Sequence, residues 1–535
     1  MAGYVSVNRP GRVSSFILCL AIGGAPLPFG SRDPITVAVW CFLLGFGLLF
    51  ASPRQLQRGH FLLLGGIAGI IACYGFVLHE QLADHPWIAA PNPIWAKTSE
   101  LLGQPLVPSV SIIRGEPFYA LGAQLANVLA LILGVMVGAD REGARRALQV
   151  MVWAGVGYAA YGIIALLFDP TAILWRTKTV NTESLTATFI NRNTAAAYFG
   201  SCAVAWLIMF LARVRGQLPA GPIVWTKLAQ NTVAGGQKQI IIRFFMFFVC
   251  LAAMFMTGSR GGVLVSLFSM VLAFVVFLRR DLPRVTSLVV VLVGAGVFSL
   301  ALLQLLGGNV VSRIDAGGLV EVGRLAAYQS SLRIIADYPW FGTGLGTFTS
   351  IFPAYRSGDI SILGIWNVAH STPLELTVEL GLPLVLVIAA GWITALVVLI
   401  RGTGRSRRDT VVPLIALAVS LIALLHSSID FPLQVSGYAI VVFALVGVGL
   451  AQSLDTNSLP PPLHRRRSRS RSGKIKSSES LLDESVDAEA RDVELAEGGL
   501  SSVSRYIRSW FSHRTDHAKV YRRRRTKSSR SDIAR

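Results

Sequence analysis

Long apolar runs alternate with short polar segments over most of the chain. Most of these runs approach the ~20 residues that a helix needs to cross the hydrocarbon of a bilayer. The pattern predicts an all-α, polytopic integral membrane protein with about twelve transmembrane helices. The predicted spans cover residues 14–30, 35–52, 61–79, 117–138, 147–168, 194–212, 243–258, 261–278, 286–306, 374–400, 411–428 and 433–451.

Composition excludes a set of soluble domains. Hydrophobic residues make up 53% of the 535 residues, only 15% are charged, and the mean hydropathy is +0.57. Arg9 and Arg12 before an apolar run resemble a secretory signal, but further spans follow directly, so we expect an uncleaved first helix. All five cysteines fall inside predicted spans, with neither a disulfide framework nor the spacing of a zinc site.

Lys and Arg concentrate in alternate loops, which are expected to be cytoplasmic together with both termini. The intervening loops, 80–116, 169–193 and 307–373, are expected outside. The basic loops carry Arg54, Arg58, Arg141, Arg145, Arg146, Arg213, Arg215, Lys227, Lys238, Arg243, Arg279, Arg280, Arg284, Arg401, Arg405, Arg407 and Arg408.

A change of composition divides the chain into a transmembrane body, 1–451, and a basic cytoplasmic tail, 452–535. The tail holds much of the net charge of +20 and is expected to be largely disordered. Its basic clusters could bind anionic lipids, or could simply be solvated. Nucleic acid is not expected as a partner of an integral membrane protein.

The largest external loop, 307–373, gathers arginines on the side that usually carries few, which indicates an anionic ligand. Residues 324–337 predict a helix ended by Pro339, with one apolar face resting on the membrane and its arginines facing water or ligand. The glycines at 342–346 predict a turn or a close backbone approach to a substrate. The loop arginines are Arg313, Arg324, Arg333 and Arg356, and the apolar face is Leu325, Tyr328, Leu332 and Ile335.

Arg260 lies in a very short turn between two spans whose other ends are expected to be cytoplasmic, so it is predicted at the outer membrane edge. Its guanidinium can offer a planar fork of donors to a phosphate. The alternative is an arginine that snorkels to the interface.

His370 precedes a helix start, with Thr372 predicted as N-cap, Pro373 at N1 and Glu375 closing a capping box. A neutral imidazole there is suited to general-base work, although a lone interfacial histidine is more often structural. Glu375 is expected to cap. Glu379, one turn deeper, is expected to pair or to face a cavity.

Asn191, Arg192 and Asn193 end the 169–193 loop and offer amides to sugar hydroxyls and a charge to phosphate. The alternative, which can hold at the same time, is that Asn193 caps the next helix. His426 and Asp430 place polar groups at another outer edge, where a simple turn is the stronger interpretation.

Together these segments resemble the O-antigen ligase and O-antigen polymerase superfamily over roughly residues 180–440. Departures from its pattern are Arg192, where the family usually has Pro, and Ser371, where Asn commonly follows the histidine. The matching pieces are Phe189-Ile190-Asn191-Arg192-Asn193; Gly258-Ser259-Arg260-Gly261; Arg324 followed by Pro339, Gly342, Gly344 and Gly346; and Ala369-His370-Ser371 followed by Glu375, Glu379 and Gly381.

The resemblance implies an inverting, metal-independent glycosyltransferase of the bacterial inner membrane. It implies transfer of a glycan from an undecaprenyl-pyrophosphate donor at the periplasmic face, without a cofactor. Arg260 and Arg324 would bind the pyrophosphate, and His370 would orient or deprotonate the attacking hydroxyl. Substrate contacts are expected from Asn191, Arg192, Asn193, Ser259, Gly344, Glu375, Glu379 and Asp430.

Three activities stay open at this point. A ligase would use a lipid A-core sugar as acceptor, and a polymerase of O-antigen or exopolysaccharide would use a second carrier-linked glycan. A transporter or flippase of lipid-linked oligosaccharides is the alternative from another class, and it would use buried charges near the midplane of broken helices.

Overall fold

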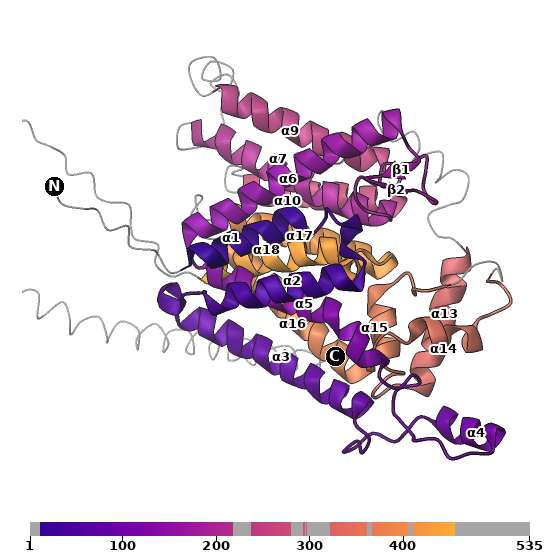
Figure 1. The fold of residues 1–535 in the computed structure, drawn as a ribbon. Helices are drawn as coiled ribbons and strands as arrows, with labels where there is room; N and C mark the ends of the chain where they lie inside the picture. The colour runs from indigo at the N-terminus through magenta and orange to yellow at the C-terminus, as the bar shows by residue number, and fades with distance from the viewer. Residues whose placement is uncertain are drawn as a thin grey trace, which may run out of the picture. The chain divides into compact units, whose positions relative to one another are not determined.

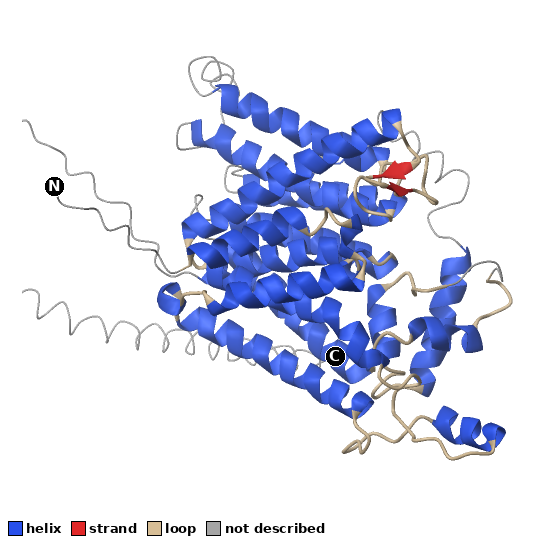
Figure 2. Ribbon diagram, in the orientation of Figure 1, coloured by secondary structure: helices blue, strands red, loops and turns tan. Residues whose placement is uncertain are grey.

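The computed structural model describes residues 11–217, 237–279, 322–360, 366–404 and 410–454, together with residues 293, 294 and 296. The chain divides into two units, Met1–Ser458 and Leu459–Arg535, and all described residues belong to the first. Helices dominate that unit (Figures 1 and 2). The predicted tail and the predicted span 286–306 therefore lie, entirely or almost entirely, outside the described residues.

Nine of the described helices are long and apolar enough to cross a membrane, which confirms an all-α polytopic membrane protein. Two shorter apolar helices, α1 (Arg12–Gly24) and α2 (Pro34–Leu49), precede them, so the count of about twelve is not confirmed. The nine are α3 (Arg58–Leu82), α5 (Glu116–Gly138), α6 (Arg141–Phe168), α7 (Arg192–Gln217), α9 (Gln237–Met256), α10 (Arg260–Leu278), α16 (Leu382–Gly402), α17 (Val411–Ile429) and α18 (Ser436–Leu454).

Short elements complete the described structure. The helices are α4 (Pro93–Leu102), α13 (Val322–Asp337), α14 (Phe348–Tyr355) and α15 (Thr372–Leu380), with 3-10 turns η1 (Phe29–Ser31), η2 (Pro53–Gln55) and η3 (Pro432–Gln434). Strands β1 (Ala172–Ile173) and β2 (Arg176–Thr177) form an antiparallel hairpin in which Ala172 pairs with Thr177 and Ile173 with Arg176.

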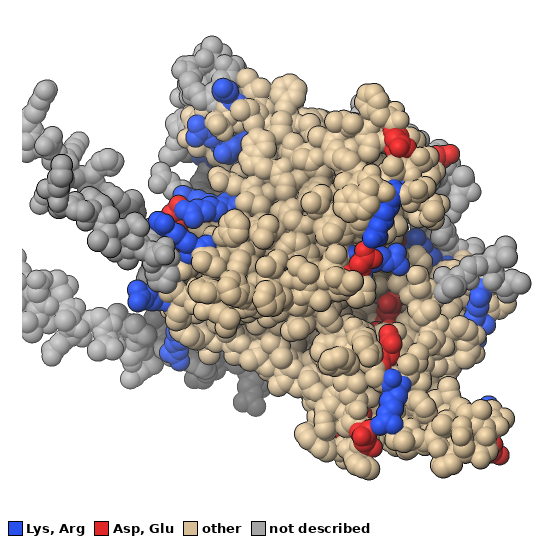
Figure 3. Space-filling view, viewed as in Figure 1, with Lys and Arg blue, Asp and Glu red and all other residues tan. Residues whose placement is uncertain are grey.

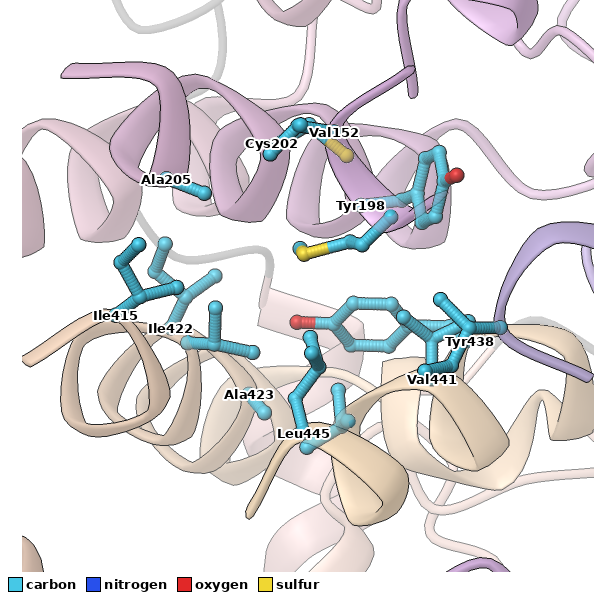
Figure 4. Packing of buried hydrophobic residues seen from close by; sticks show 14 of the residues in the cluster. Val152, Tyr198, Cys202, Ala205, Ile415, Ile422, Ala423, Tyr438, Val441 and Leu445 are labelled. Carbon is cyan, nitrogen blue, oxygen red and sulfur yellow. The ribbon is translucent and has the colours of Figure 1, made fainter. Parts of the chain in front are cut away.

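Helices α7, α17 and α18 form the centre of the bundle. The buried share of their apolar windows is 72%, 67% and 89%, against 17% for α3 and 11% for α16. Ser201 Oγ of α7 lies 3.1 Å from Tyr438 Oη of α18, and Tyr438 packs in one apolar cluster with residues of α7 and α17 (Figure 4). The outer helices therefore present most of their apolar surface to lipid, as expected in a bilayer.

Glycines let α5 and α18 approach closely. A Cβ on Gly134 would lie 2.4 Å from the carbonyl oxygen of Ala444, and one on Gly447 would lie 2.3 Å from that of Leu131. Lipid is as apolar as a leucine side chain, so close backbone packing of this kind holds membrane helices together.

The predicted span 374–400 is wrong as a single helix, because the chain breaks at Gly381 into α15 and α16. Gly381 has a φ of 82°, and a Cβ there would lie 2.2 Å from the carbonyl oxygen of Trp340. Only glycine fits this close crossing. The nine-residue α15 thus belongs to the polar end of the molecule, and α16 is the membrane helix.

The three long loops meet at one end of the bundle, which we call the site end. Gln81 at the end of α3 donates hydrogen bonds to the carbonyl oxygens of Phe341 and Glu379, at 2.7 and 2.8 Å. The 169–193 loop bonds to the end of α9 through Leu185 N and Met256 O, at 2.9 Å. Lys and Arg gather at the opposite end, whereas the site end carries both signs of charge (Figure 3).

A small outer unit of α13, α14 and α15 caps the site end. Ala327, Ile334, Phe348 and Phe352 form its core. The predicted helix 324–337 is confirmed by α13, which ends at Asp337, two residues before Pro339. Leu325 and Leu332, predicted on a face that rests on the membrane, are 52% and 55% exposed, and the face packed on the protein holds Ala327 and Ile334.

Candidate functional site

Asp430 lies at the centre of the candidate site. It follows α17 as its C-cap, and only 2% of it is exposed. Its Oδ2 accepts a hydrogen bond from Asn193 Nδ2 and lies 3.3 Å from Arg324 Nη1. Its Oδ1 lies 3.6 Å from His370 Nδ1. One carboxylate thus brings together side chains from α7, α13 and the segment before α15.

Burial alone raises the pKa of Asp430, but the nearby imidazole of His370 and the charge of Arg324 outweigh it and hold the pKa below its usual value. The carboxylate is therefore charged at neutral pH. It can both neutralise Arg324 and orient the imidazole of His370.

Two further bonds hold α13 in place, one to the end of α17 and one to the segment before α15. Arg324 Nη1 donates to the carbonyl oxygen of Ile429 at 3.2 Å, and Tyr328 Oη donates to the carbonyl oxygen of His370 at 2.9 Å. Because Tyr328 is one helical turn after Arg324, both side chains leave the same face of α13. Tyr328, predicted on the apolar face that rests on the membrane, thus bonds to the backbone of His370.

His370 is held in a constrained backbone conformation. Its φ is 54°, in the left-handed region that non-glycine residues rarely adopt. Its ring packs edge-on against Trp366 and Phe431, with centroid distances of 5.5 and 5.3 Å. About a quarter of the side chain, 26%, is exposed, so the imidazole is positioned by the protein and still accessible to a ligand.

The predicted capping box at His370 is wrong by one residue. Helix α15 begins at Thr372 with Ser371 as N-cap, and the Ser371 side chain makes no capping bond. Glu375 therefore sits one position too far into the helix to bond the N-cap amide. Its Oε2 accepts from Ala369 N at 2.7 Å, which fixes the backbone directly before His370.

Glu379 supports the glycine segment rather than contacting His370. Its Oε1 accepts from Phe348 N at 3.1 Å, at the start of α14, and its carbonyl oxygen accepts from Gly344 N at 3.1 Å. Burial, with electrostatic repulsion between carboxylates in the case of Glu375, raises the pKa of both Glu375 and Glu379. These two acids lie behind the site as its internal scaffold.

Gly344 makes its close approach to the protein itself. Its φ is 109°, and a Cβ there would lie 2.1 Å from Ser111 Oγ. The predicted alternative, an approach to substrate, is thus not needed to explain this glycine.

Asn191 and Asn193 have different partners: Asn191 caps α7, and Asn193 bonds to Asp430. Asn191 Oδ1 accepts from the backbone amides of Asn193 and Thr194, at 2.6 and 3.3 Å, so it caps α7. The predicted assignment of the cap to Asn193 is wrong, because the Asn193 side chain turns to Asp430 instead. Arg192 is the first residue of α7 and is half-buried.

Arg260 is the first residue of α10, and Ser259 is its N-cap, accepting from Gly262 N at 3.2 Å. A Cβ on Gly261 would lie 2.8 Å from Ile429 Cδ1, so the start of α10 packs on the last turn of α17. Arg260 therefore lies beside the turn that carries Asp430. His426, 1% exposed, fills the space behind it.

The arrangement combines guanidinium groups with an imidazole oriented by a carboxylate. Guanidinium groups can bind the oxygens of a phosphate, and an oriented imidazole can take a proton from a hydroxyl. Among the described residues, no group of three or more His, Cys, Asp or Glu is placed to hold a metal ion.

Comparison with known proteins bears on this site directly. A search of curated proteins found no match. Residues 245–389 match the family model described as O-antigen ligase, and this segment contains Arg260, Arg324 and His370. The resemblance to the O-antigen ligase and polymerase superfamily seen in the sequence is thereby confirmed over residues 245–389, within a multi-pass membrane protein.

Proposed function

We propose that the protein is a glycosyltransferase that moves a glycan from undecaprenyl pyrophosphate to a sugar hydroxyl, as an O-antigen ligase does. The observation that carries the proposal is the convergence of Arg324 and His370 on Asp430, beside the helix start that bears Arg260. The donor, a lipid A-core or glycan acceptor, and an inverting reaction without metal or cofactor are parts of this proposal.

In the proposed reaction, the acceptor hydroxyl oxygen forms a bond to the anomeric carbon of the donor. The bond from that carbon to the pyrophosphate oxygen breaks, and its electron pair stays on the pyrophosphate. Arg260 and Arg324 stabilise the negative charge that grows there. The attack comes from the opposite side of the carbon, so the configuration inverts.

His370 takes the proton of the attacking hydroxyl. Asp430, 3.6 Å from Nδ1, favours the tautomer with the proton on Nδ1, which leaves Nε2 free to act as the base. Asn193 holds the second carboxylate oxygen of Asp430. Asp430 and Asn193 are thus positioning residues in this scheme.

A periplasmic site in the bacterial inner membrane is proposed on the distribution of charge. The basic residues gather at the end opposite the site, and such ends usually remain in the cytoplasm (Figure 3). The basic tail would then lie inside, where its clusters would attract anionic lipids.

The test is reconstitution with an undecaprenyl-pyrophosphate glycan and candidate acceptors, measuring released undecaprenyl pyrophosphate and product. Arg260→Ala, Arg324→Ala and His370→Ala should each lower turnover by about 100-fold or more. Arg114→Ala, which removes an exposed arginine paired with Asp84 at the same end, is the matched control and should stay active. Equal product from the wild type and all three site variants would refute the assignment.

The choice of acceptor separates the related activities. Product on a lipid A-core sugar supports a ligase, and elongation of a carrier-linked glycan supports a polymerase of O-antigen or exopolysaccharide. Movement of the donor across vesicles without any new glycosidic bond would instead support the transporter or flippase alternative.

A further inference from the structure

A second cationic group stands apart from the Asp430 cluster. Arg356 follows α14 as its C-cap and is half-buried. Its Nε and Nη2 are shielded from solvent, and neither has a hydrogen-bond partner among the described residues. The neighbouring Ser357 Oγ is also shielded from solvent and has no hydrogen-bond partner among the described residues.

Two other arginines of the described structure have acceptors for a terminal guanidinium nitrogen, although Arg324 Nε has no hydrogen-bond partner among the described residues. Arg324 lies 3.3 Å from Asp430, and Arg279 donates to the carbonyl oxygen of Thr403 at 3.0 Å. Shielded guanidinium nitrogens without an acceptor are unfavourable, because the hydration that they lose is not replaced. Arg356 is therefore a donor group whose acceptor must come from outside the described part of the protein.

The two acidic residues nearest in these segments, Asp337 and Asp359, form no ion pair with Arg356 in the described structure. Asp337 at the end of α13 accepts a hydrogen bond from Tyr355, the residue before Arg356. Asp359 is exposed. No ion pair among the described residues thus balances the positive charge of Arg356.

Arg356 is linked to the reaction centre through a row of rings. Phe352, one turn before Arg356 on α14, stacks on Trp366 with a centroid distance of 6.0 Å. Trp366 in turn contacts His370, at 5.5 Å. Thr349 of α14 also donates to the carbonyl oxygen of Asn367 at 3.3 Å, so α14 is fixed to the segment that carries His370.

We propose that Arg356 and Ser357 bind an anionic substituent of the glycan substrate, a carboxylate or a phosphate on a sugar. The proposal rests on the proposed function and names its substrate class as an acidic glycan. A planar guanidinium can bond two oxygens of either anion, and the Ser357 hydroxyl can add a third donor. A glycan bound at His370 brings such a group to this outer unit.

Thermal unfolding of the full chain in nanodiscs tests this without any turnover. The probes are methyl glucuronide and glucose 1-phosphate, with methyl glucoside as the neutral match, at constant ionic strength. A ligand that binds the folded state raises the melting temperature with its concentration. Both anions should bind the wild type about tenfold or more tighter than methyl glucoside does.

Arg356→Gln should abolish this preference, and Arg333→Gln, which removes an exposed arginine of α13, should retain it. Arg356→Met should melt above the wild type without ligand, since it removes a shielded charge that no described ion pair balances. Should Arg356→Gln not fold, Arg356→Lys keeps the charge without the fork and should still lose most of the preference.

Three results would overturn the inference. They are equal stabilisation by the acidic and neutral sugars, an equal response of Arg356→Gln and wild type, and a response that follows phosphatidylglycerol content in place of the sugar. The last would assign the site to a lipid headgroup. Because the assay measures binding only, its failure is distinguishable from a failure of glycosyl transfer.

Discussion

Replacing Asp430 by Asn removes one negative charge and changes little else in shape. Asp430 lies 3.3 Å from Arg324 and 3.6 Å from His370, and it accepts from Asn193. In Asp430→Asn, Arg324 loses its counter-charge and His370 loses the group that orients its ring. The side-chain amide of the new asparagine must also point at least one N–H toward a group that donated a hydrogen bond to the carboxylate.

Coulomb's law bounds the size of the effect. At 3.3 Å, the attraction between Asp430 and Arg324 is about 1 kcal/mol in the dielectric of water and about 5 kcal/mol at an effective dielectric of 20. Desolvation of both groups offsets part of it, and Arg324 is 26% exposed. We expect Asp430→Asn to lower the free energy of unfolding by about 2–4 kcal/mol.

Asp430→Asn should also lower the turnover rate strongly. Without the carboxylate, the imidazole no longer prefers the tautomer in which Nε2 is the base. We expect kcat to fall by about 100-fold to 10,000-fold, with a smaller change in KM.

The stability difference has a defined dependence on pH. Because the folded pKa of Asp430 is depressed, its contribution is fully present above the unfolded pKa of about 4 and is lost as the pH falls through the folded value. The gap in melting temperature between wild type and Asp430→Asn should be constant from about pH 6 to 8 and should shrink below about pH 4.

The assay combines turnover of the reconstituted enzyme with thermal melts over this pH range. Asn193→Ala, which removes one donor and leaves the charge, is the matched control and should fall between wild type and Asp430→Asn in both readouts. A kcat within threefold of wild type, together with an unchanged melting temperature, would refute the role of Asp430 as the organising charge.

Three further changes test the supports of the site. Gly381→Ala should destabilise the protein by about 2 kcal/mol or more, since its Cβ would meet Trp340; Gly115→Ala has a similar φ of 85° but open space, and equal losses in thermal melts would exclude the clash. Asn191→Ala should cost about 1 kcal/mol of stability through loss of the α7 cap, with wild-type kcat; a large drop in kcat would show that Asn191 contacts substrate. Because the folded pKa of Glu375 is raised, the wild type should lose stability as pH rises above about 4; Glu375→Gln should remove part of this slope, and an unchanged slope in melts from pH 4 to 8 would contradict it.

Local patterns predicted much of what the structure shows. The lengths of the apolar runs are enough to predict most of the spans. The short turn before α10 places Arg260 at the edge of a span, and this holds for any arrangement of the other helices. Helix α13 and its stop before Pro339 also followed from periodicity and proline chemistry. These features depend on residues that are close together in the sequence, so one sequence is enough to predict them.

Features that depend on distant partners could not be predicted in the same way. The break at Gly381 exists because the Trp340 carbonyl oxygen crosses there, and apolar residues continue on both sides of it. Asn191 and Asn193 are chemically equivalent in the sequence, and only the position of Asp430, 237 residues beyond Asn193, decides which of them caps the helix. Asp430 itself looked like a turn residue, since its three partners come from other segments.

Helix α3 connects the site to the bilayer. Its 25 residues span about 37 Å, more than the ~30 Å of a hydrocarbon core, and only 17% of its apolar window is buried against the protein. Its ends are tied by His60 to the Ala451 carbonyl oxygen and by Gln81 to those of Phe341 and Glu379. A thicker or thinner bilayer changes the tilt that such a helix prefers, and we expect Gln81 to transmit part of this change to the glycine turn behind His370.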